Sequence, residues 1–359
     1  MCKIKVLHQV LNPSGSGGVS AEYRALSHSL LTEKYEFIPM ILNNFHSGIS
    51  PKDISFYRKK IKEASPDIIH VRGAAVDGLN AVIAAKLAGK GKVIVTVHGM
   101  YSDLVYISKL KRFISKYIIE RLIFGMADGI SCVCKAAEQR PYFNKYRRKM
   151  LPFVYNRMPE YDTNKKDICR REIRKTYGIA SDSTVALYVG RITREKGLDI
   201  LTEAINSGKE ELPSDFTLII VGEGDYLNQL KVDCKKLKIK TIFTGDRRDV
   251  ESFYFAADFF IQPSLHENHS IALLEAYAAG LPAIATYCGG NPEIVEDNVT
   301  GIIVPTANPE ELKNGIIKMC NTQRLNAFRE NIKNTDYEQF SNSAVDAALD
   351  RIYTEIRRN

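Results

Sequence analysis

The chain has 359 residues, of which 45% are hydrophobic and 26% are charged, as is typical of folded soluble proteins. A chain of this length is too long for one ordinary hydrophobic core and predicts two domains. It contains no run of about 18 apolar residues, which argues against a membrane-spanning helix.

The N-terminus and the cysteines favour a cytoplasmic protein. The first residues read as a short strand with no apolar leader and no small-residue cleavage site, so we expect no signal peptide. Seven cysteines are scattered without the spacing of a metal site or a disulfide framework, a pattern that suits a reducing compartment.

Charge is distributed unevenly along the chain. Residues 1–160 contain 25 Lys and Arg against 12 Asp and Glu, a net charge of +13, which leaves −5 of the total of +8 for the remainder. Such a difference between the two halves indicates that the first half contacts something anionic.

Strand and helix patterns alternate through the first half. Apolar strands are expected at Ile4–Val10, Phe37–Leu42, Asp67–Val71, Val93–His98 and Gly129–Cys134. Helical periodicity is found between them at Val19–Leu31, Val76–Ala88 and Tyr106–Phe124. Near-continuous apolar strands separated by helices predict a parallel sheet that is covered on both faces.

The second half repeats this pattern. Its strands are expected at Val185–Gly190, Leu218–Gly222, Thr241–Gly245, Phe259–Gln262, Ala283–Thr286 and Ile302–Val304. Two such blocks predict two doubly wound, Rossmann-like α/β domains, one over residues 1–160 and one over residues 165–337. The polar stretch Asn156–Asp167 is the expected linker, and residues 338–359 form a final helix.

Polar residues follow the ends of several expected strands. Ligands of open α/β sheets bind at this edge, so Arg191 and Lys196 after one strand are candidates for binding an anion. An ordinary solvated pair on a turn is the alternative. The glycine-rich turn Ser14–Gly18 would let backbone N–H groups approach a phosphate, and His98 ends another strand.

The segment from Gln262 to Gly280 combines a strand end, a polar turn with Glu267, and a helix opening near His269 that contains Glu275. Seven residues separate the two glutamates, which places them roughly 9–12 Å apart along a helix axis. Two glutamates at this spacing also occur by chance, so their meaning depends on Arg191 and Lys196 upstream.

The string from Gly190 to Gly197, with Glu267 coming 71 positions after Lys196 and then Glu275, resembles glycosyltransferase family 4. Members of this family are retaining enzymes of the GT-B fold, in which two Rossmann-like domains face a cleft. The resemblance implies transfer of a hexose from a nucleotide-diphosphate donor to a hydroxyl acceptor, and a final helix that crosses back to the first domain.

The resemblance also implies roles for individual residues. It assigns the diphosphate to Arg191 and Lys196, the ribose to Glu275, donor-sugar hydroxyls to Glu267, and the reacting centre to His98. It also implies further contacts with the donor. These come from Gly17 and Gly18 in the glycine-rich turn, from Arg247 beside the nucleotide base, and from His269, Ser270 and Ile271 at the start of the helix that contains Glu275.

Two other functions remain open: a sugar-nucleotide epimerase of the same fold, and a nucleotide-binding regulator without catalysis. No Asp-x-Asp pair occurs that could bind a metal bridging the diphosphate, so we expect no metal and no cofactor. The expected donor is a UDP-sugar. A glycan or lipid-linked acceptor of surface-polysaccharide assembly is expected from the basic first half. No nucleic-acid-binding module is recognisable.

The stretch Tyr106–Phe124 has apolar residues at helical spacing and five basic residues. It could bind an anionic membrane surface, which would place the protein at the inner face of the cell membrane. A helix that packs into the core, with its cations in solvent, is the equal alternative.

Overall fold

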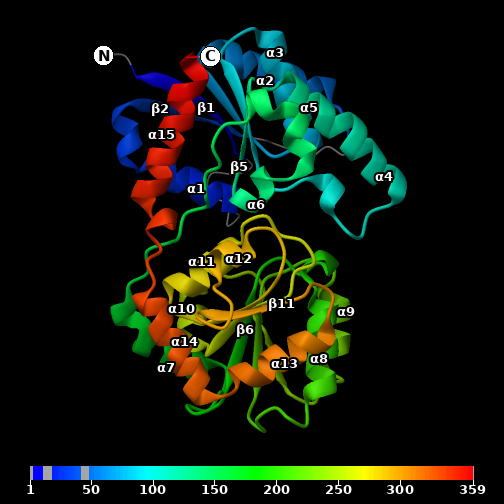
Figure 1. The fold of residues 1–359 in the computed structure, drawn as a ribbon, viewed down its shortest axis with the longest axis vertical. Helices are drawn as coiled ribbons and strands as arrows, with labels where there is room; N and C mark the ends of the chain where they lie inside the picture. The colour runs from blue at the N-terminus through cyan, green and yellow to red at the C-terminus, as the bar shows by residue number, and fades with distance from the viewer. Residues whose placement is uncertain (1–2, 11–17, 42–47, 359) are drawn as a thin grey trace. The chain divides into compact units, whose positions relative to one another are not determined.

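The computed structural model describes the backbone of residues 3–10, 18–41 and 48–358. The chain divides into two compact units (Figure 1). Unit 1 comprises Met1–Arg157 and Glu338–Asn359, and unit 2 comprises Met158–Tyr337. The last helix of the chain therefore belongs to unit 1.

The described part of unit 1 contains a sheet of five parallel strands in the order β2-β1-β3-β4-β5. The strands are β1 (Ile4–Val10), β2 (Tyr35–Ile41), β3 (Ile68–Arg72), β4 (Lys92–Val97) and β5 (Gly129–Cys132). The sheet interior is formed by apolar residues of β1, β3 and β4, which are almost completely buried. Burial on both faces explains why these strands read as continuous apolar runs.

Helices cover both faces of this sheet (Figure 1). The longer ones are α1 (Gly18–Ser27), α2 (Pro51–Ala64), α3 (Val76–Ala88), α4 (Lys109–Ile114), α5 (Glu120–Met126) and α15 (Asn342–Arg358). A short helix, α6 (Lys135–Glu138), follows β5. Helices α2, α3 and α5 share one core with the sheet, whereas α15 packs on the other face against β1 to β4.

A buried ion-pair cluster attaches α15 to the rest of unit 1. The Arg157 guanidinium contacts Glu22 of α1 at 3.0 Å and Asp346 of α15 at 2.6 Å. It also donates to the backbone carbonyl of Asn342 at 3.1 Å. The Arg157 side chain is only 6% exposed, so its two carboxylate partners compensate a charge that water does not reach.

Unit 2, which is described throughout, has six parallel strands in the order β11-β10-β9-β6-β7-β8. They are β6 (Val185–Val189), β7 (Thr217–Val221), β8 (Lys240–Phe243), β9 (Phe259–Gln262), β10 (Ala283–Thr286) and β11 (Gly301–Val304). This is the order 3-2-1-4-5-6 of a doubly wound nucleotide-binding sheet, which reverses direction between β6 and β9.

The helices of unit 2 form a layer on each side of its sheet (Figure 1). They are α7 (Lys166–Thr176), α8 (Leu198–Gly208), α9 (Leu227–Cys234), α10 (Val250–Ala256), α11 (Ile271–Ala278), α12 (Asn291–Ile294), α13 (Pro309–Met319) and α14 (Thr322–Asn334). Helices α8, α9, α13 and α14 share one core. The two parallel sheets confirm the predicted pair of doubly wound domains.

Some expected elements end elsewhere. The helix expected at Tyr106–Phe124 begins at Lys109, contains a π-helical turn at Ser115–Ile119 and ends at Met126. The helix expected near His269 begins at Ile271, because the Ser270 hydroxyl caps it by accepting from the Leu273 N–H.

We predict that Arg157→Met lowers the free energy of unfolding of unit 1 by about 3–5 kcal/mol, because two buried carboxylates lose their counter-charge. The matched control is Lys34→Met, which removes another cation that binds α15. Lys34 pairs with Asp350 at 2.6 Å, but the two side chains are 47% and 36% exposed. The control should cost about 1 kcal/mol or less. Urea denaturation checks both variants, and equal losses would contradict the prediction.

Candidate functional site

The loops that follow β6 and β9 lie side by side at the point where the strand order of unit 2 reverses. Gly197 has φ +65°, and a Cβ on it would lie 2.0 Å from the Pro263 carbonyl oxygen. The Leu265 N–H donates to the Glu195 carbonyl at 2.9 Å. Only glycine permits this approach, so the sequence Lys196-Gly197 brings a cation next to the loop that contains Glu267.

Lys196 and Glu267 form an ion pair through Nζ and Oε1. The same carboxylate oxygen accepts from Gln262 Nε2 at 2.7 Å and from Ser264 Oγ at 2.9 Å. The two charged side chains are 19% and 13% exposed, so they are shielded from water yet accessible from one side. This arrangement fixes a carboxylate and an ammonium group at the carboxyl edge of the sheet.

Arg191 lies at the same edge but is exposed. Its backbone is held in place because the Tyr188 hydroxyl donates to the Arg191 carbonyl at 2.8 Å. Burial raises the pKa of Tyr188, and the negative charge of Glu267 adds to that rise. Tyr188 therefore stays protonated as a donor, while the Arg191 guanidinium is accessible to a ligand.

The last three residues before α11, Asn268–Ser270, are buried and uncharged. His269 is 6% exposed, and burial lowers its pKa to about 3, so it is uncharged at physiological pH. A Cβ on Gly289, which follows β10, would lie 2.0 Å from the Glu267 carbonyl oxygen, so this loop supports the turn from behind. The N–H groups at the start of α11, beginning with Ile271, present the positive end of the helix dipole.

Glu275 lies farther along α11 in a different environment. It is half-buried and accepts a hydrogen bond from the Tyr254 hydroxyl at 2.8 Å. Burial raises the pKa of Glu275 to about 7, and the Tyr254 hydrogen bond only partly opposes that shift. The carboxyl group therefore titrates near neutrality, in contrast to an ordinary surface glutamate.

Arg247, the residue expected near a base, already has partners in this structure. Its guanidinium donates two hydrogen bonds of 2.8 Å to the Asp249 carboxylate and lies 5.5 Å from the centre of the Phe253 ring. The Arg247 side chain is exposed even though it is paired with Asp249. The predicted role of Arg247 remains a prediction.

The other expected residues belong to unit 1. His98 follows β4 directly, is half-buried, and lies close enough to His70 to lower its pKa. Gly18 is the first residue of α1. Gly17 lies outside the described residues.

The structure adds partners that sequence reasoning missed. Gln262, the last residue of β9, and Ser264, two residues later, hydrogen-bond Glu267, so their place at the carboxyl edge was a usable signal. Tyr254 contacts Glu275 from α10, 21 positions away, and no local pattern indicates that contact. Across residues 3–10, 18–41 and 48–358, no three His, Cys, Asp or Glu side chains are grouped so that they could hold a metal ion.

Two family models match this chain, one mostly in unit 2 and one in unit 1. A model described as Glycosyl transferases group 1 matches residues 169–339, and one described as Glycosyltransferase Family 4 matches residues 16–140.

Residues 3–10, 18–41 and 48–358 contain no helix with the length and apolar character needed to span a bilayer.

Two curated proteins are similar over most of the chain. The Escherichia coli UDP-Gal:alpha-D-GlcNAc-diphosphoundecaprenol alpha-1,3-galactosyltransferase is 27% identical over 306 residues, covering 83% of this chain and 78% of that protein. The Bacillus anthracis N-acetyl-alpha-D-glucosaminyl L-malate synthase is 24% identical over 319 residues, covering 86% and 81%. The crystal structure of Anabaena HepE in complex with UDP-glucose superposes with a TM-score of 0.78 at 18% identity, over 98% of this chain and 100% of HepE.

We predict that Glu275→Gln stabilises the ligand-free protein at pH 8 by at most about 3 kcal/mol, because the pKa rises from 4.5 to about 7 on folding. A raised carboxyl pKa means that the ionised form is penalised in the folded state. The gain should therefore shrink between pH 7 and 4.5 and vanish below that range. Denaturation at several pH values checks this, with exposed Glu203→Gln on α8 as the control. A gain that does not change with pH would contradict it.

Proposed function

This chain is a glycosyltransferase of family 4 with the GT-B fold, and we propose that it transfers a hexose from a UDP-sugar to a lipid-linked glycan with retention of the anomeric configuration. The observation that supports this most is the Lys196–Glu267 pair beside the N-terminus of α11. A cation, a carboxylate and a helix N-terminus at one switch point suit a sugar attached to a diphosphate.

In the proposed reaction, the bond between the anomeric carbon and the β-phosphate oxygen breaks as an acceptor oxygen bonds to the same face of that carbon. The acceptor hydroxyl gives its proton to the departing diphosphate, and UDP leaves. Arg191 and Lys196 stabilise the charge that develops on the diphosphate, together with the N–H groups at Ser270 and Ile271. These cations would replace a metal, so we expect chelators to leave activity unchanged.

The two glutamates would divide the recognition of the donor. Glu267, held by Gln262 and Ser264, would accept hydrogen bonds from the transferred sugar. Glu275 would accept them from the ribose hydroxyls, and hydrogen bonding to its ionised form would lower its pKa from about 7 on binding. Contact with the sugar remains the role proposed for His98.

The choice of donor and acceptor is supported by the relatives. The Escherichia coli enzyme uses UDP-Gal and an acceptor linked to diphosphoundecaprenol, and HepE binds UDP-glucose. The basic character of residues 1–160, with a net charge of +13, favours an acceptor of this anionic kind. Such an acceptor would place the enzyme in surface-polysaccharide assembly.

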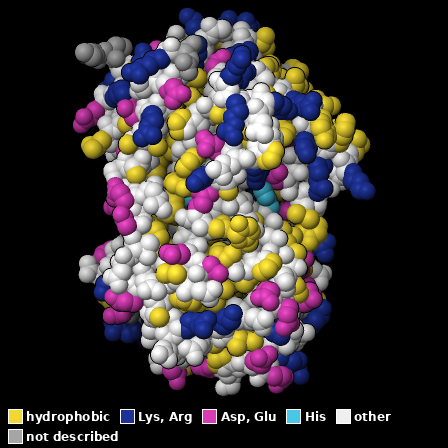
Figure 2. Space-filling model, in the orientation of Figure 1, with side chains coloured by type: hydrophobic (Ala, Val, Ile, Leu, Met, Phe, Trp, Pro, Cys, Tyr) yellow, Lys and Arg dark blue, Asp and Glu magenta, His cyan; other side chains and the backbone are white. Residues whose placement is uncertain are grey.

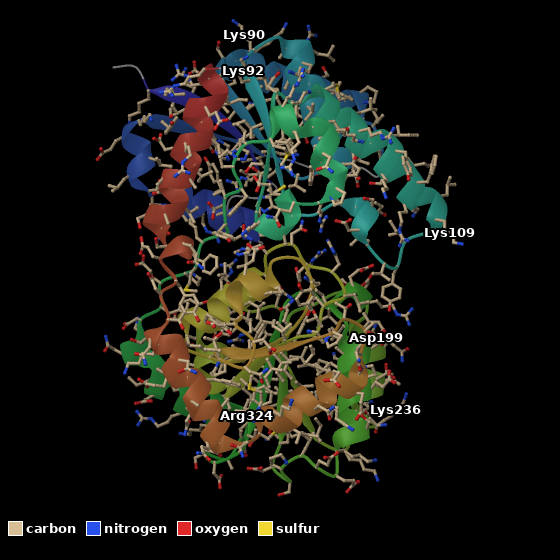
Figure 3. All side chains as sticks on the ribbon, in the orientation of Figure 1. Lys90, Lys92, Lys109, Asp199, Lys236 and Arg324 are labelled. Atoms are coloured by element: carbon tan, nitrogen blue, oxygen red, sulfur yellow. The ribbon has the colours of Figure 1, made fainter. Side chains whose placement is uncertain are left out.

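The stretch from α4 to α5 is the proposed contact with an anionic membrane. Its exposed apolar residues include Leu110 at 67%, Phe113 at 56% and Ile118 at 48%. Lys and Arg side chains lie among hydrophobic ones over these helices (Figure 2), and Lys109 marks the start of α4 (Figure 3). Apolar side chains that water surrounds, mixed with cations, match the interface of an anionic bilayer, and a peripheral location at the inner face of the cell membrane follows.

We predict that UDP raises the melting temperature of the protein more than GDP or ADP does. Glu275→Ala should weaken UDP binding by about 10- to 100-fold, because charged hydrogen bonds to the ribose are lost.

Lys196→Ala should lower kcat by about 10²- to 10³-fold, because the charge that develops on the diphosphate loses a stabilising cation. Thermal shift, calorimetry and product release with and without acceptor measure these effects. Lys236→Ala serves as the control, since its exposed side chain pairs with Asp233 on α9 (Figure 3).

The outcomes separate the candidate functions. Release of UDP that requires an acceptor supports the transferase, whereas conversion of the UDP-sugar without an acceptor would indicate an epimerase. No shift with any nucleotide at millimolar concentration would refute the proposed donor site.

We predict that the protein sediments with vesicles that contain anionic phospholipid and not with neutral ones. The double variant Leu110→Gln and Phe113→Gln should bind at least about tenfold more weakly, because each loses apolar burial worth about 1 kcal/mol. The matched control is Leu87→Gln on α3, where a leucine is 57% exposed outside the basic stretch. Equal binding to neutral vesicles, or an equal loss in the control, would count against this surface.

A further inference from the structure

Unit 1 has its own switch point, between β1 and β3, because its strand order 2-1-3-4-5 reverses there. Arg72 is the last residue of β3, and Gln9 is the last but one of β1. The two are connected, since the Arg72 backbone N–H donates to Gln9 Oε1 at 3.1 Å. Both lie at the carboxyl edge, where sheets of this type bind ligands.

Arg72 is buried without a counter-charge. It is 7% exposed, and among the described residues its Nε has no hydrogen-bond partner and its guanidinium forms no ion pair. Gln9 is 2% exposed, and its Nε2 also lacks a partner among the described residues. The segments 11–17 and 42–47 contain no Asp or Glu in the sequence, so they offer no carboxylate either.

The layer of side chains next to Arg72 is uncharged, and its polar atoms are largely hydrogen-bonded to one another, although His8 Nδ1 has no partner among the described residues. Tyr353 OH lies 2.8 Å from His70 Nδ1 and 3.1 Å from His8 Nε2, and Thr96 Oγ1 lies 2.7 Å from His70 Nε2. Burial lowers the pKa of both histidines well below their usual value, and the charge of Arg72 lowers it further. Neither histidine supplies a negative charge.

One carboxylate whose charge acts on this layer is already ion-paired elsewhere. Together with burial, the negative charge of Glu22 contributes to the raised pKa of Tyr353, but Glu22 is ion-paired with Arg157 at 3.0 Å. A buried guanidinium without a carboxylate is costly in free energy, whereas a paired one is tolerated. A planar guanidinium with free donors is also the group best suited to bind phosphate or carboxylate through two hydrogen bonds.

We propose that Arg72, assisted by the carboxamide of Gln9, is an anion-binding subsite of unit 1 that takes a phosphate or carboxylate group of the acceptor. Assignment of the anion to the acceptor rests on the proposed function, whereas anion binding itself does not. The bound anion supplies the missing counter-charge and accepts from Arg72 Nε and Gln9 Nε2, so both unpartnered donors are satisfied together.

The test compares wild type with Arg72→Met in the full chain. Binding of inorganic pyrophosphate and of malonate is measured by calorimetry with unit 2 saturated by UDP, so that the two probes distinguish phosphate from carboxylate. We expect at least one probe to bind wild type and to bind the variant at least tenfold more weakly. Arg72→Lys should recover part of that affinity, and Lys196→Ala should retain it.

The melting temperature of the ligand-free variant supplies an independent readout. Removal of an uncompensated buried charge should leave it unchanged or raise it, whereas loss of a structural arginine would lower it. Unaltered probe affinity in Arg72→Met would overturn the proposal, as would a lower melting temperature without any probe binding to wild type. Should Arg72→Met fail to fold, Gln9→Leu must weaken probe binding, and unchanged binding there also overturns the proposal.

Failure of the proposed function is distinguishable from failure of this inference. If UDP does not bind, pyrophosphate is titrated into the Arg191→Ala/Lys196→Ala background, where the cations of unit 2 are absent. Binding that still depends on Arg72 would then support the subsite while the donor assignment falls. Loss of pyrophosphate binding in this background would refute the subsite, and if UDP does bind the wild type, the donor assignment stands despite that loss.

Discussion

Reversal of strand order in a parallel sheet is the constraint on which the rest of this structure depends. Where neighbouring strands continue into helices on opposite faces, the loops after them diverge and leave polar groups uncovered. In unit 2 this happens between β6 and β9, where Lys196 meets Glu267. In unit 1 it happens between β1 and β3, where Arg72 lies. Charged side chains that a ligand could contact therefore lie at the carboxyl edge of each sheet.

Two buried charged clusters elsewhere are matched by opposite charges. Asp258 in unit 2 accepts from Arg170 at 2.8 Å and from Arg174 at 2.9 Å, and its carboxylate also accepts from the Val185 N–H. Arg157 in unit 1 has two carboxylates. Against these closed clusters, the side chains at the switch points are incompletely satisfied or half-exposed. This contrast is what separates groups that stabilise the fold from groups available to a ligand.

The fold class was predictable because buried parallel strands leave continuous apolar runs with helical segments between them. Strand ends were harder: the runs expected to reach Gly190 and Gly222 stop one residue earlier, where φ values of +150° and +131° turn the backbone away. The pair of Lys196 and Glu267 was suggested by the family resemblance. The burial of Arg72 and the Tyr254–Glu275 contact were not predictable, because both depend on residues distant in sequence.

The place of α15 in unit 1 has a consequence for synthesis on the ribosome. Unit 1 is built from two segments, and all of unit 2 lies between them in the chain. The apolar face formed by residues such as Val6, Ile68 and Ile94 packs against α15, which is translated after unit 2. While the roughly 180 intervening residues are translated, this apolar face has no α15 to pack against. The Glu22–Arg157 pair likewise lacks its third member, Asp346 of α15. Vectorial folding of this protein therefore proceeds through a nascent chain in which unit 2 is complete before unit 1.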